Sequence, residues 1–317
     1  MNISEAQNKI LSVKNNIDRV IIGKDEVKKL LLTAFFSDGH VLLEDVPGTG
    51  KTMLSKALSV SIDSKFSRIQ FTPDLLPADI VGLNIYNRAK ESFEYVPGPI
   101  MTNILLADEI NRATPRTQSA LLEAMQEKQV TVDKGTRKLM DPFFVIATQN
   151  PVETSGTFPL PEAELDRFMM MLSIGTLTVE EEVKMLSLFE NKTPLDELTA
   201  VITEEEIAEV KNTIQGVYIH PDLLEYIARI AEVTRNDSTT VMGVSPRGSL
   251  ALMKAAKTFA LIEGRDYVIP EDIKALTIPV LTHRIIFVNR KDKVSKEQYL
   301  KAIIDKVPVP TEEFNVR

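Results

Sequence analysis

The chain has 317 residues, of which 44 % are hydrophobic and 26 % are charged, as is typical of a globular protein with a packed core. It contains no cysteine and three histidines far apart in sequence, which excludes disulfides and cysteine nucleophiles and argues against a histidine-rich metal centre. Acidic residues outnumber basic residues by 45 to 37, which argues against a general nucleic-acid coat protein.

No apolar run reaches the roughly 18 residues that a membrane-spanning helix needs. The first ten residues also lack the basic start and apolar stretch of a secretory signal. We therefore expect a cytoplasmic protein with no membrane span.

The first half of the chain alternates short apolar runs with longer amphipathic stretches. Five runs predict buried strands: Val41–Glu44, Ser67–Phe71, Ile104–Ala107, Phe143–Thr148 and Phe168–Leu172. The stretches between them are long enough for crossover helices such as Ser119–Gln126. Strands that alternate with crossovers predict an α/β fold, with a mostly parallel sheet between helices.

After about Gly175 the pattern becomes helical. Thr178 and Thr203 each precede a glutamate by three residues, which predicts two capped helix starts. Leu223–Val233, Leu250–Ile262 and Pro270–Leu281 continue the helical period. The whole acidic surplus lies within residues 180–209, so it marks the start of a helical second domain and says little about the rest of the surface.

The strongest local signal is Glu44-Asp-Val-Pro-Gly-Thr-Gly-Lys-Thr52, which lies between a predicted strand and a helical run. Phosphate binds where a strand turns into a helix, because backbone N–H groups and the helix dipole both attract anions. Lys51 would reach the β- and γ-phosphates of ATP, and the Thr52 hydroxyl would bind Mg²⁺. The residues predicted to bind ATP here are Pro47, Gly48, Thr49, Gly50, Lys51, Thr52 and Met53.

One departure weakens this motif, because Asp45 stands where the full pattern has a glycine. The alternative interpretation is a glycine turn with an incidental lysine. The glycine-lysine-threonine end and the strand-to-helix context favour phosphate binding.

A second acidic element is expected at the end of a later strand. Ile104-Leu-Leu-Ala-Asp-Glu109 fits, with Asp108 binding Mg²⁺ largely through water and Glu109 acting as the general base on the attacking water. The alternative interpretation is that the two acids merely follow a buried strand. The phosphate loop upstream makes this alternative the weaker one.

The order of motifs from Val20 to Arg247 resembles an AAA+ ATPase. Four runs resemble the MoxR branch of its helix-2-insert clade: Leu43–Thr52, Asp108–Ala113, Ala147–Pro151 and Pro161–Phe168. In that branch Asp45 is a familiar variant. The resemblance implies a P-loop AAA+ core over residues 1–175, with a five-stranded parallel sheet flanked by helices, and an all-α lid domain over residues 176–317.

The resemblance also assigns further residues. Asn150 matches sensor 1, which orients the water against the γ-phosphate, and Arg247 matches sensor 2 on the lid. Arg167 matches the arginine finger, which serves the nucleotide of the neighbouring subunit. A surface ion pair is the alternative for each arginine. Val20 and Ile21 match the strip beside adenine, or they belong to the core.

Two further segments match features of the clade. Residues 82–99 match the helix-2 insert, and residues 130–139 match the hairpin before sensor 1. In ring-shaped relatives such loops line the pore and contact the client. Lys134, Arg137 and Lys138 could contact DNA, but a solvated hairpin tip is the simpler interpretation.

These features predict an ATP hydrolase that forms a homo-oligomer, a hexameric ring by resemblance, and that uses ATP turnover to remodel or mature a client protein. Family companions with von Willebrand factor A domains are the expected clients. A nucleic-acid-dependent motor of the same clade is the alternative, although no separate DNA-binding domain is visible. A binding scaffold without turnover is disfavoured because Glu109 and Arg167 are both present.

Overall fold

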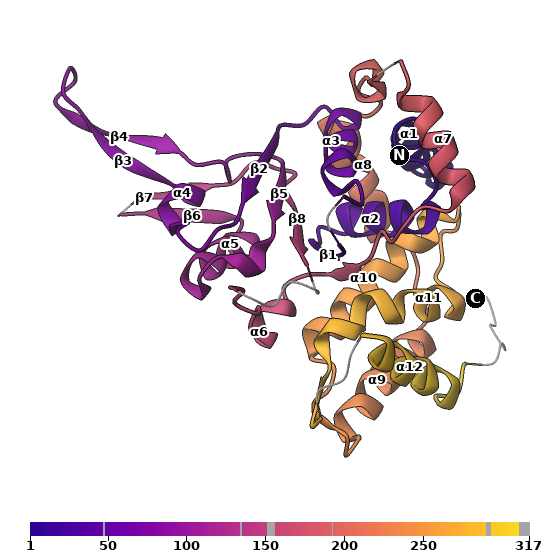
Figure 1. The fold of residues 1–317 in the computed structure, drawn as a ribbon. Coiled ribbons are helices and arrows are strands. Elements are labelled where there is room, and N and C mark those ends of the chain that lie inside the picture. The colour runs from indigo at the N-terminus through magenta and orange to yellow at the C-terminus, as the bar shows by residue number, and fades with distance from the viewer. Residues whose placement is uncertain (47, 134, 151–155, 192, 290–292, 311–317) are drawn as a thin grey trace.

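The computed structural model describes the chain except residues 47, 134, 151–155, 192, 290–292 and 311–317. Pro47, Lys134 and Pro151, which the sequence analysis singled out, therefore lie outside the described residues. In the described part, five parallel strands form one sheet in the order β2-β5-β8-β1-β9 (Figure 1). Their bounds are β1 Val41–Glu44, β2 Phe66–Gln70, β5 Ile104–Asp108, β8 Phe144–Gln149 and β9 Met170–Leu172. The predicted α/β fold with a five-stranded parallel sheet is confirmed.

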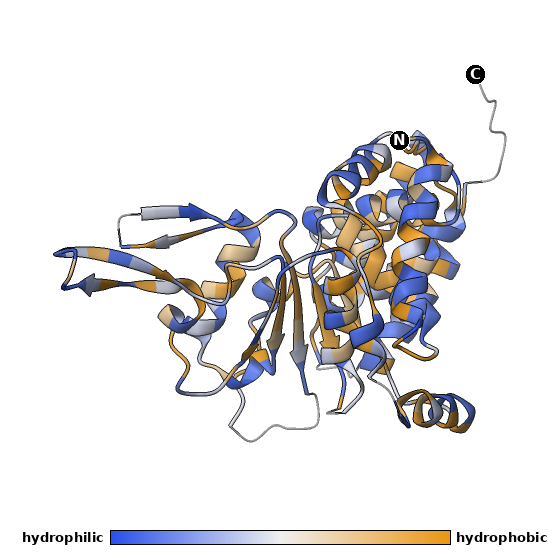
Figure 2. Ribbon diagram, turned by 90° about the horizontal axis from the view of Figure 1, so that it is seen from above, coloured by the Kyte–Doolittle hydropathy of each residue, from blue (hydrophilic) through white to orange (hydrophobic). Residues whose placement is uncertain are grey.

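Burial on both faces explains why these strands are continuous apolar runs. Along β1, Val41 and Leu43 belong to one buried cluster, and Leu42 belongs to the cluster on the opposite face. Such alternation is the period of a strand, with successive side chains on opposite faces. In Figure 2 the hydrophobic colour fills the strands and continues into the helices beside them.

Helices cover the two faces of the sheet. The first cluster joins the sheet to α1 (Ile3–Asp18), α2 (Asp25–Phe36) and α3 (Lys51–Ser61), and it continues into the lid helices. The second cluster joins the sheet to α5 (Pro115–Glu127). The short elements η1 (Ile110–Arg112) and α6 (Glu162–Leu165) complete this half. Because the lid shares the first cluster with the sheet, the two halves are packed into one continuous core.

Two antiparallel hairpins extend from the sheet on the side opposite the lid, in both Figure 1 and Figure 2. After α4 (Pro77–Val81), β3 (Gly82–Asn87) pairs with β4 (Ser92–Pro97). The second hairpin pairs β6 (Gln129–Val132) with β7 (Gly135–Lys138). Gly82 starts the first hairpin with φ +93°, and a Cβ there would lie 2.3 Å from the Val96 carbonyl oxygen, so only glycine fits this turn.

The lid is helical. Its elements are α7 Val179–Phe189, η2 Pro194–Glu197, α8 Glu204–Gln215, α9 Pro221–Asn236, α10 Pro246–Ile262, α11 Pro270–Leu281, η3 Thr282–Arg284 and α12 Lys293–Lys306. Both predicted capping boxes are present, at Thr178 and at Thr203. The lid also holds one strand pair that the sequence pattern did not predict, between β10 (Thr240–Met242) and β11 (Ile286–Phe287). In the described part, no helix has the length and apolar character needed to cross a membrane.

Candidate functional site

The phosphate loop lies between the end of β1 and the start of α3. In the sheet, β1 lies between β8 and β9, which are not its neighbours in sequence. In open parallel sheets such a switch point leaves a crevice outside the carboxyl ends of the strands, and ligands bind there. Gly48 and Gly50 have φ of 86° and 85°, which glycine adopts without strain. The first turn of α3 therefore directs its unpaired N–H groups toward the crevice, as anion binding requires.

Lys51 is the first residue of α3, and its Nζ donates a hydrogen bond to the Asp45 carbonyl oxygen at 2.9 Å. The ammonium is thus held over the loop at the position from which it would meet a phosphate. Thr52 follows it in the first turn, and Ser55 fixes the turn by donating to the Lys51 carbonyl oxygen at 2.9 Å.

Asp45 is buried, with 6 % of its surface exposed, and its side chain binds the segment that leaves β9. Its carboxylate accepts hydrogen bonds from the Ser173 hydroxyl at 2.7 Å, from the Ile174 N–H at 2.7 Å and from the Gly175 N–H at 3.1 Å. The residue that departs from the usual phosphate-loop pattern therefore ties the loop to the start of the lid. No signal near Asp45 in the sequence indicates these partners.

The two predicted acids lie at the end of β5, opposite the loop. Asp108 accepts hydrogen bonds from the Thr148 hydroxyl and from Arg68, each at 2.6 Å. The Glu109 N–H donates to the same Thr148 hydroxyl at 2.8 Å. Thr148 is 1 % exposed, so this bridge fixes both acids to β8.

Glu109 has φ of 55°, a left-handed conformation that costs a non-glycine residue about 1–2 kcal/mol. Its carboxylate accepts hydrogen bonds from Gln70 at 2.8 Å and from Arg112 at 3.1 Å. Both donors therefore compete with water for the oxygen atoms of Glu109. Neither Gln70 nor Arg112 was predicted to belong to the site.

A cavity of about 490 Å³ brings the loop and the acids together. Its lining includes the loop and first turn of α3 (residues 48–53), Lys56, Arg68, Gln70, Asp108, Glu109, Asn150 and Leu195. Cations and carboxylates thus face one another across a space where phosphate and a divalent cation would fit. In the described residues no group of three acidic, histidine or cysteine side chains could hold a metal. The Thr52 hydroxyl and Asp108 fit Mg²⁺, which usually takes one or two protein ligands and completes its shell with phosphate and water.

A second cavity of about 490 Å³ adjoins the first and shares Gly48, Thr49, Gly50 and Met53 with it. Its other walls are Val20, Ile21, Ile22, Lys24, Val46, the segment 174–177, Glu182, Met185 and Phe189. Apolar walls beside a phosphate site suit a flat heteroaromatic base. Val20 is 2 % exposed and belongs to the hydrophobic core, and it also lines this cavity. The two interpretations made from the sequence, a residue beside adenine and a core residue, are therefore compatible. Met185 and Phe189 of α7 were not predicted.

The two predicted arginines lie elsewhere. Arg167 follows α6, and Arg247 lies in the first turn of α10, where it is exposed. Neither lines either cavity. The Arg167 side chain has no hydrogen bond or ion pair with another described residue. The structure thus gathers Lys51, Thr52, Asp108, Glu109 and Asn150 around one cavity and leaves both arginines outside it.

Comparison with known proteins decides the family. Residues 40–170 match the model of the ATPase family associated with various cellular activities (AAA), and residues 232–303 match the AAA lid domain. The chain is 38 % identical to the chaperone MoxR1 of Mycobacterium tuberculosis, over 93 % of this chain and 80 % of that protein. The chain belongs to the MoxR family of AAA ATPases.

Other relatives cover nearly the whole of this MoxR-family chain. The uncharacterized protein YeaC of Bacillus subtilis is 51 % identical over 95 % of both chains. A Cytophaga hutchinsonii protein that is assigned as an ATPase has a crystal structure that matches this chain with a TM-score of 0.90. The two sequences are 39 % identical, and the match covers 98 % of this chain and 97 % of that one. The matched AAA region of the MoxR-family chain contains the phosphate loop, both acids, Asn150 and Arg167.

Proposed function

We propose that this chain hydrolyses ATP to ADP and phosphate in the cavity between α3 and the end of β5. The observation that supports this most directly is the juxtaposition of Lys51, Glu109 and Asn150 around one space. The N–H groups of the loop and Lys51 would bind the β- and γ-phosphates. The second cavity would hold the adenine, with Val20 and Ile21 on one side and α7 on the other.

Thr52 and Asp108 would hold magnesium between them and the phosphates. When bound, the ion would neutralise charge on the β- and γ-phosphate oxygens. Glu109 would take a proton from the attacking water, and Asn150 would orient that water. Gln70 and Arg112 both donate to Oε2 of Glu109, so rearrangement of these two donors would free that oxygen for the attacking water.

Neither Arg167 nor Arg247 lines either cavity, and Arg68, the arginine in the described lining, is bonded to the Asp108 carboxylate at 2.6 Å. We propose that Arg167 acts on the nucleotide of a neighbouring copy, which requires a homo-oligomer. A closed ring, hexameric by family resemblance, would give every site such a neighbour because head-to-tail interfaces close into rings. An arginine supplied in this way is worth roughly 10³–10⁵ in rate in other phosphoryl-transfer systems.

The hairpin β3–β4 suits contact with a client protein. Several of its apolar side chains are exposed, among them Phe93 at 72 %, Tyr86 at 50 % and Ile85 at 48 %. Exposed apolar patches of this kind mark surfaces that bind other proteins. We propose that this MoxR-family chain remodels or matures a cytoplasmic client, with proteins that contain a von Willebrand factor A domain as the partners to test.

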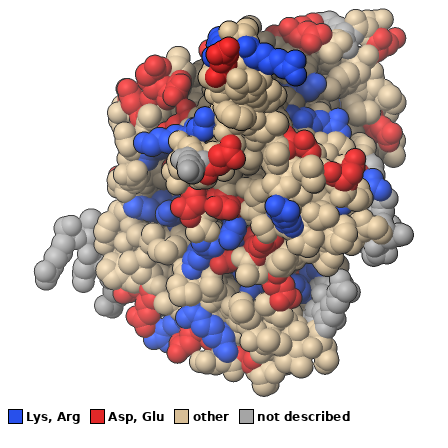
Figure 3. All heavy atoms as spheres, turned by 90° about the vertical axis from the view of Figure 1, so that its left-hand side faces the viewer, with Lys and Arg blue, Asp and Glu red and all other residues tan. Residues whose placement is uncertain are grey.

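The same face gives little support to a nucleic-acid motor. Viewed from the hairpin side, Lys and Arg side chains are interspersed with Asp and Glu (Figure 3). A protein that follows a phosphate backbone needs a positive stripe. Arg137 stacks its guanidinium over the Tyr95 ring at 3.9 Å, which directs it to the neighbouring hairpin.

Substitution of the proposed base tests the function. Glu109→Gln should abolish turnover of Mg-ATP and retain its binding, because the amide cannot accept a proton. Glu123→Gln on the exposed face of α5 is the matched control and should keep the wild-type rate. Loss of ATP binding in Glu109→Gln, or turnover at the wild-type rate, would refute the assigned role.

A further inference from the structure

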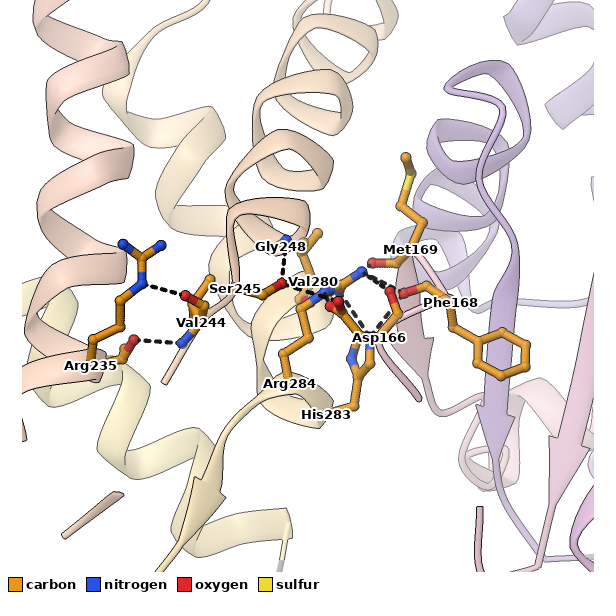
Figure 4. A network of polar contacts seen from close by, with 11 residues as sticks. Asp166, Phe168, Met169, Arg235, Val244, Ser245, Gly248, Val280, His283 and Arg284 are labelled. Carbon is orange, nitrogen blue, oxygen red and sulfur yellow. Dashed lines mark hydrogen bonds and ion pairs between the residues drawn. The ribbon is translucent and has the colours of Figure 1, made fainter. Parts of the chain in front are cut away.

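Arg284 is a buried cation of the lid that binds the segment carrying Arg167. It ends η3 and is 5 % exposed. Its Nε donates to the Asp166 carboxylate at 2.7 Å, and its Nη2 donates to the Phe168 carbonyl oxygen at 2.7 Å. Its Nη1 donates to the Met169 carbonyl oxygen at 3.1 Å and to that of Val280. Figure 4 shows the guanidinium between the lid and this segment.

The contacts enclose Arg167 on both sides. Arg284 also donates from Nη2 to the backbone carbonyl oxygen of Asp166 at 3.2 Å. The residues before and after Arg167 are therefore both bonded to one guanidinium. Among the described contacts, the Arg167 side chain takes no part in this network.

The same carboxylate connects to the helix that carries Arg247. The Ser245 hydroxyl donates to Asp166 at 3.1 Å and accepts from the Gly248 N–H at 3.2 Å, which caps α10. A Cβ on Gly248 would lie 2.8 Å from Cδ of Arg284, so the first turn of α10 packs directly on this arginine. The Arg167 segment is thus attached to the lid at two points.

Burying the Arg284 guanidinium removes it from water, which costs free energy. Burial lowers the pKa of Arg284 to about 10, against the opposing effect of Asp166, and nearby Arg247 lowers it further. The guanidinium remains charged at neutral pH. Apolar residues of similar size often replace a buried ion pair without loss of stability, so we attribute to the Arg284–Asp166 pair a role in fixing local geometry.

We propose that Arg284, together with Asp166, is a positioning residue that holds Arg167 in the direction of the neighbouring copy. This rests on the proposed function, in which Arg167 completes the site of its neighbour. Arg284 lines neither cavity, and it acts on Arg167 through the backbone on either side of it and through the Asp166 carboxylate. Its effect must therefore appear in the copy that donates the arginine and be absent from the copy that receives it.

Mixed assemblies distinguish an effect in the copy that donates Arg167 from an effect in the copy that receives it. Glu109→Gln copies cannot hydrolyse ATP but can donate Arg167, and Arg167→Ala copies cannot donate but keep an intact site. Their mixture defines the reference activity. Arg284→Lys is then added either to the donor or to the recipient. Asp166→Asn is the second variant, because its partly exposed carboxylate can be changed with less risk to folding.

We expect Arg284→Lys in the donor to lower the activity of the mixture on the order of tenfold to a hundredfold, since small displacements of a reacting group have effects of that size. In the recipient it should leave the activity within about twofold. Arg265→Lys in the donor is the matched control. It alters another ion pair of the lid, between the partly buried Arg265 and the buried Asp272 at 2.6 Å. Among the described contacts, the hydrogen bonds of this pair do not reach residues 166–169.

Equal loss from donor and recipient, loss from neither, or an equal loss in the Arg265→Lys control would overturn the positioning role. A reference mixture without activity, from a wild type that hydrolyses ATP, would instead overturn the action of Arg167 on a neighbour, and the positioning role with it. A wild type that hydrolyses no ATP in any assembly would overturn the proposed function itself.

Discussion

Replacing Asp45 with alanine removes the carboxylate that joins the phosphate loop to the segment leaving β9. Two backbone N–H groups and one hydroxyl then lose their acceptor. Hydrogen bonds to a charged group contribute about 1.5–3 kcal/mol each, so the three together contribute roughly 5–9 kcal/mol. Alanine also avoids the desolvation of a buried carboxylate, which is several kcal/mol. We therefore expect the free energy of unfolding to fall by about 3 kcal/mol.

The same substitution should weaken nucleotide binding, because the loop and the cavity wall at 174–177 lose their mutual attachment. We expect the dissociation constant for ATP to rise about tenfold, since ordering a loosened loop on binding costs on the order of 1 kcal/mol per residue. Urea unfolding followed by circular dichroism measures the first quantity, and titration with a fluorescent ATP analogue measures the second.

Asp196→Ala is the matched control, because this carboxylate lies exposed in η2. Its effect on unfolding should stay within about 0.5 kcal/mol. If Asp45→Ala changed the unfolding free energy by less than about 1 kcal/mol and left ATP affinity intact, the three hydrogen bonds would not connect the loop to the lid as described.

Three further predictions concern other parts of the molecule. Gln70→Ala should raise the basal ATPase rate a few-fold, because Glu109 loses a competing donor; an unchanged initial rate would contradict this. Phe189→Ala should weaken ATP binding about tenfold with little change in kcat, because Phe189 lines the proposed adenine cavity. Leu186 is 61 % exposed on the same helix, so Leu186→Ala should leave both quantities unchanged. Equal effects of the two substitutions in a binding titration would refute the proposed adenine cavity. Burial lowers the pKa of His40 to about 4, so between pH 6.5 and 4 the unfolded chain binds a proton that the folded chain does not. Stability should therefore fall as the pH drops through this window, with His40 contributing up to about 3 kcal/mol. His40→Gln should reduce the slope of a urea-unfolding pH series by this contribution and leave that of His283, whose pKa burial also lowers. An equally steep series for the variant would assign the dependence to other groups.

The sequence predicted the sheet well, because strands buried on both faces are apolar without interruption. Val41–Glu44 was predicted with the bounds that the structure has. The last strand was predicted from Phe168, but it begins at Met170. The physical reason is that the Phe168 and Met169 carbonyl oxygens are bonded to Arg284 of the lid, which cannot be foreseen from a local apolar run.

The part of the site that could be predicted is the part with local signals. The loop around Lys51 and the acids after β5 have characteristic neighbours in sequence, and the structure places them around one cavity. The capping box at Thr178 predicted the start of α7, but the packing that turns Phe189 toward the nucleotide cavity depends on the tertiary structure. Asp45 illustrates the limit most clearly, since its partners lie about 130 residues away.

The central claim is that ATP is hydrolysed at a site which one copy builds and the next copy completes with Arg167. Mixing Glu109→Gln with Arg167→Ala tests it most directly, because each variant alone should be inactive. Equal amounts should recover up to about a quarter of the wild-type rate, since half of the copies have an intact site and half of those have a neighbour that donates the arginine. Recovery of that size would support the claim. A mixture as inactive as its components, from variants that bind ATP and assemble, would contradict it.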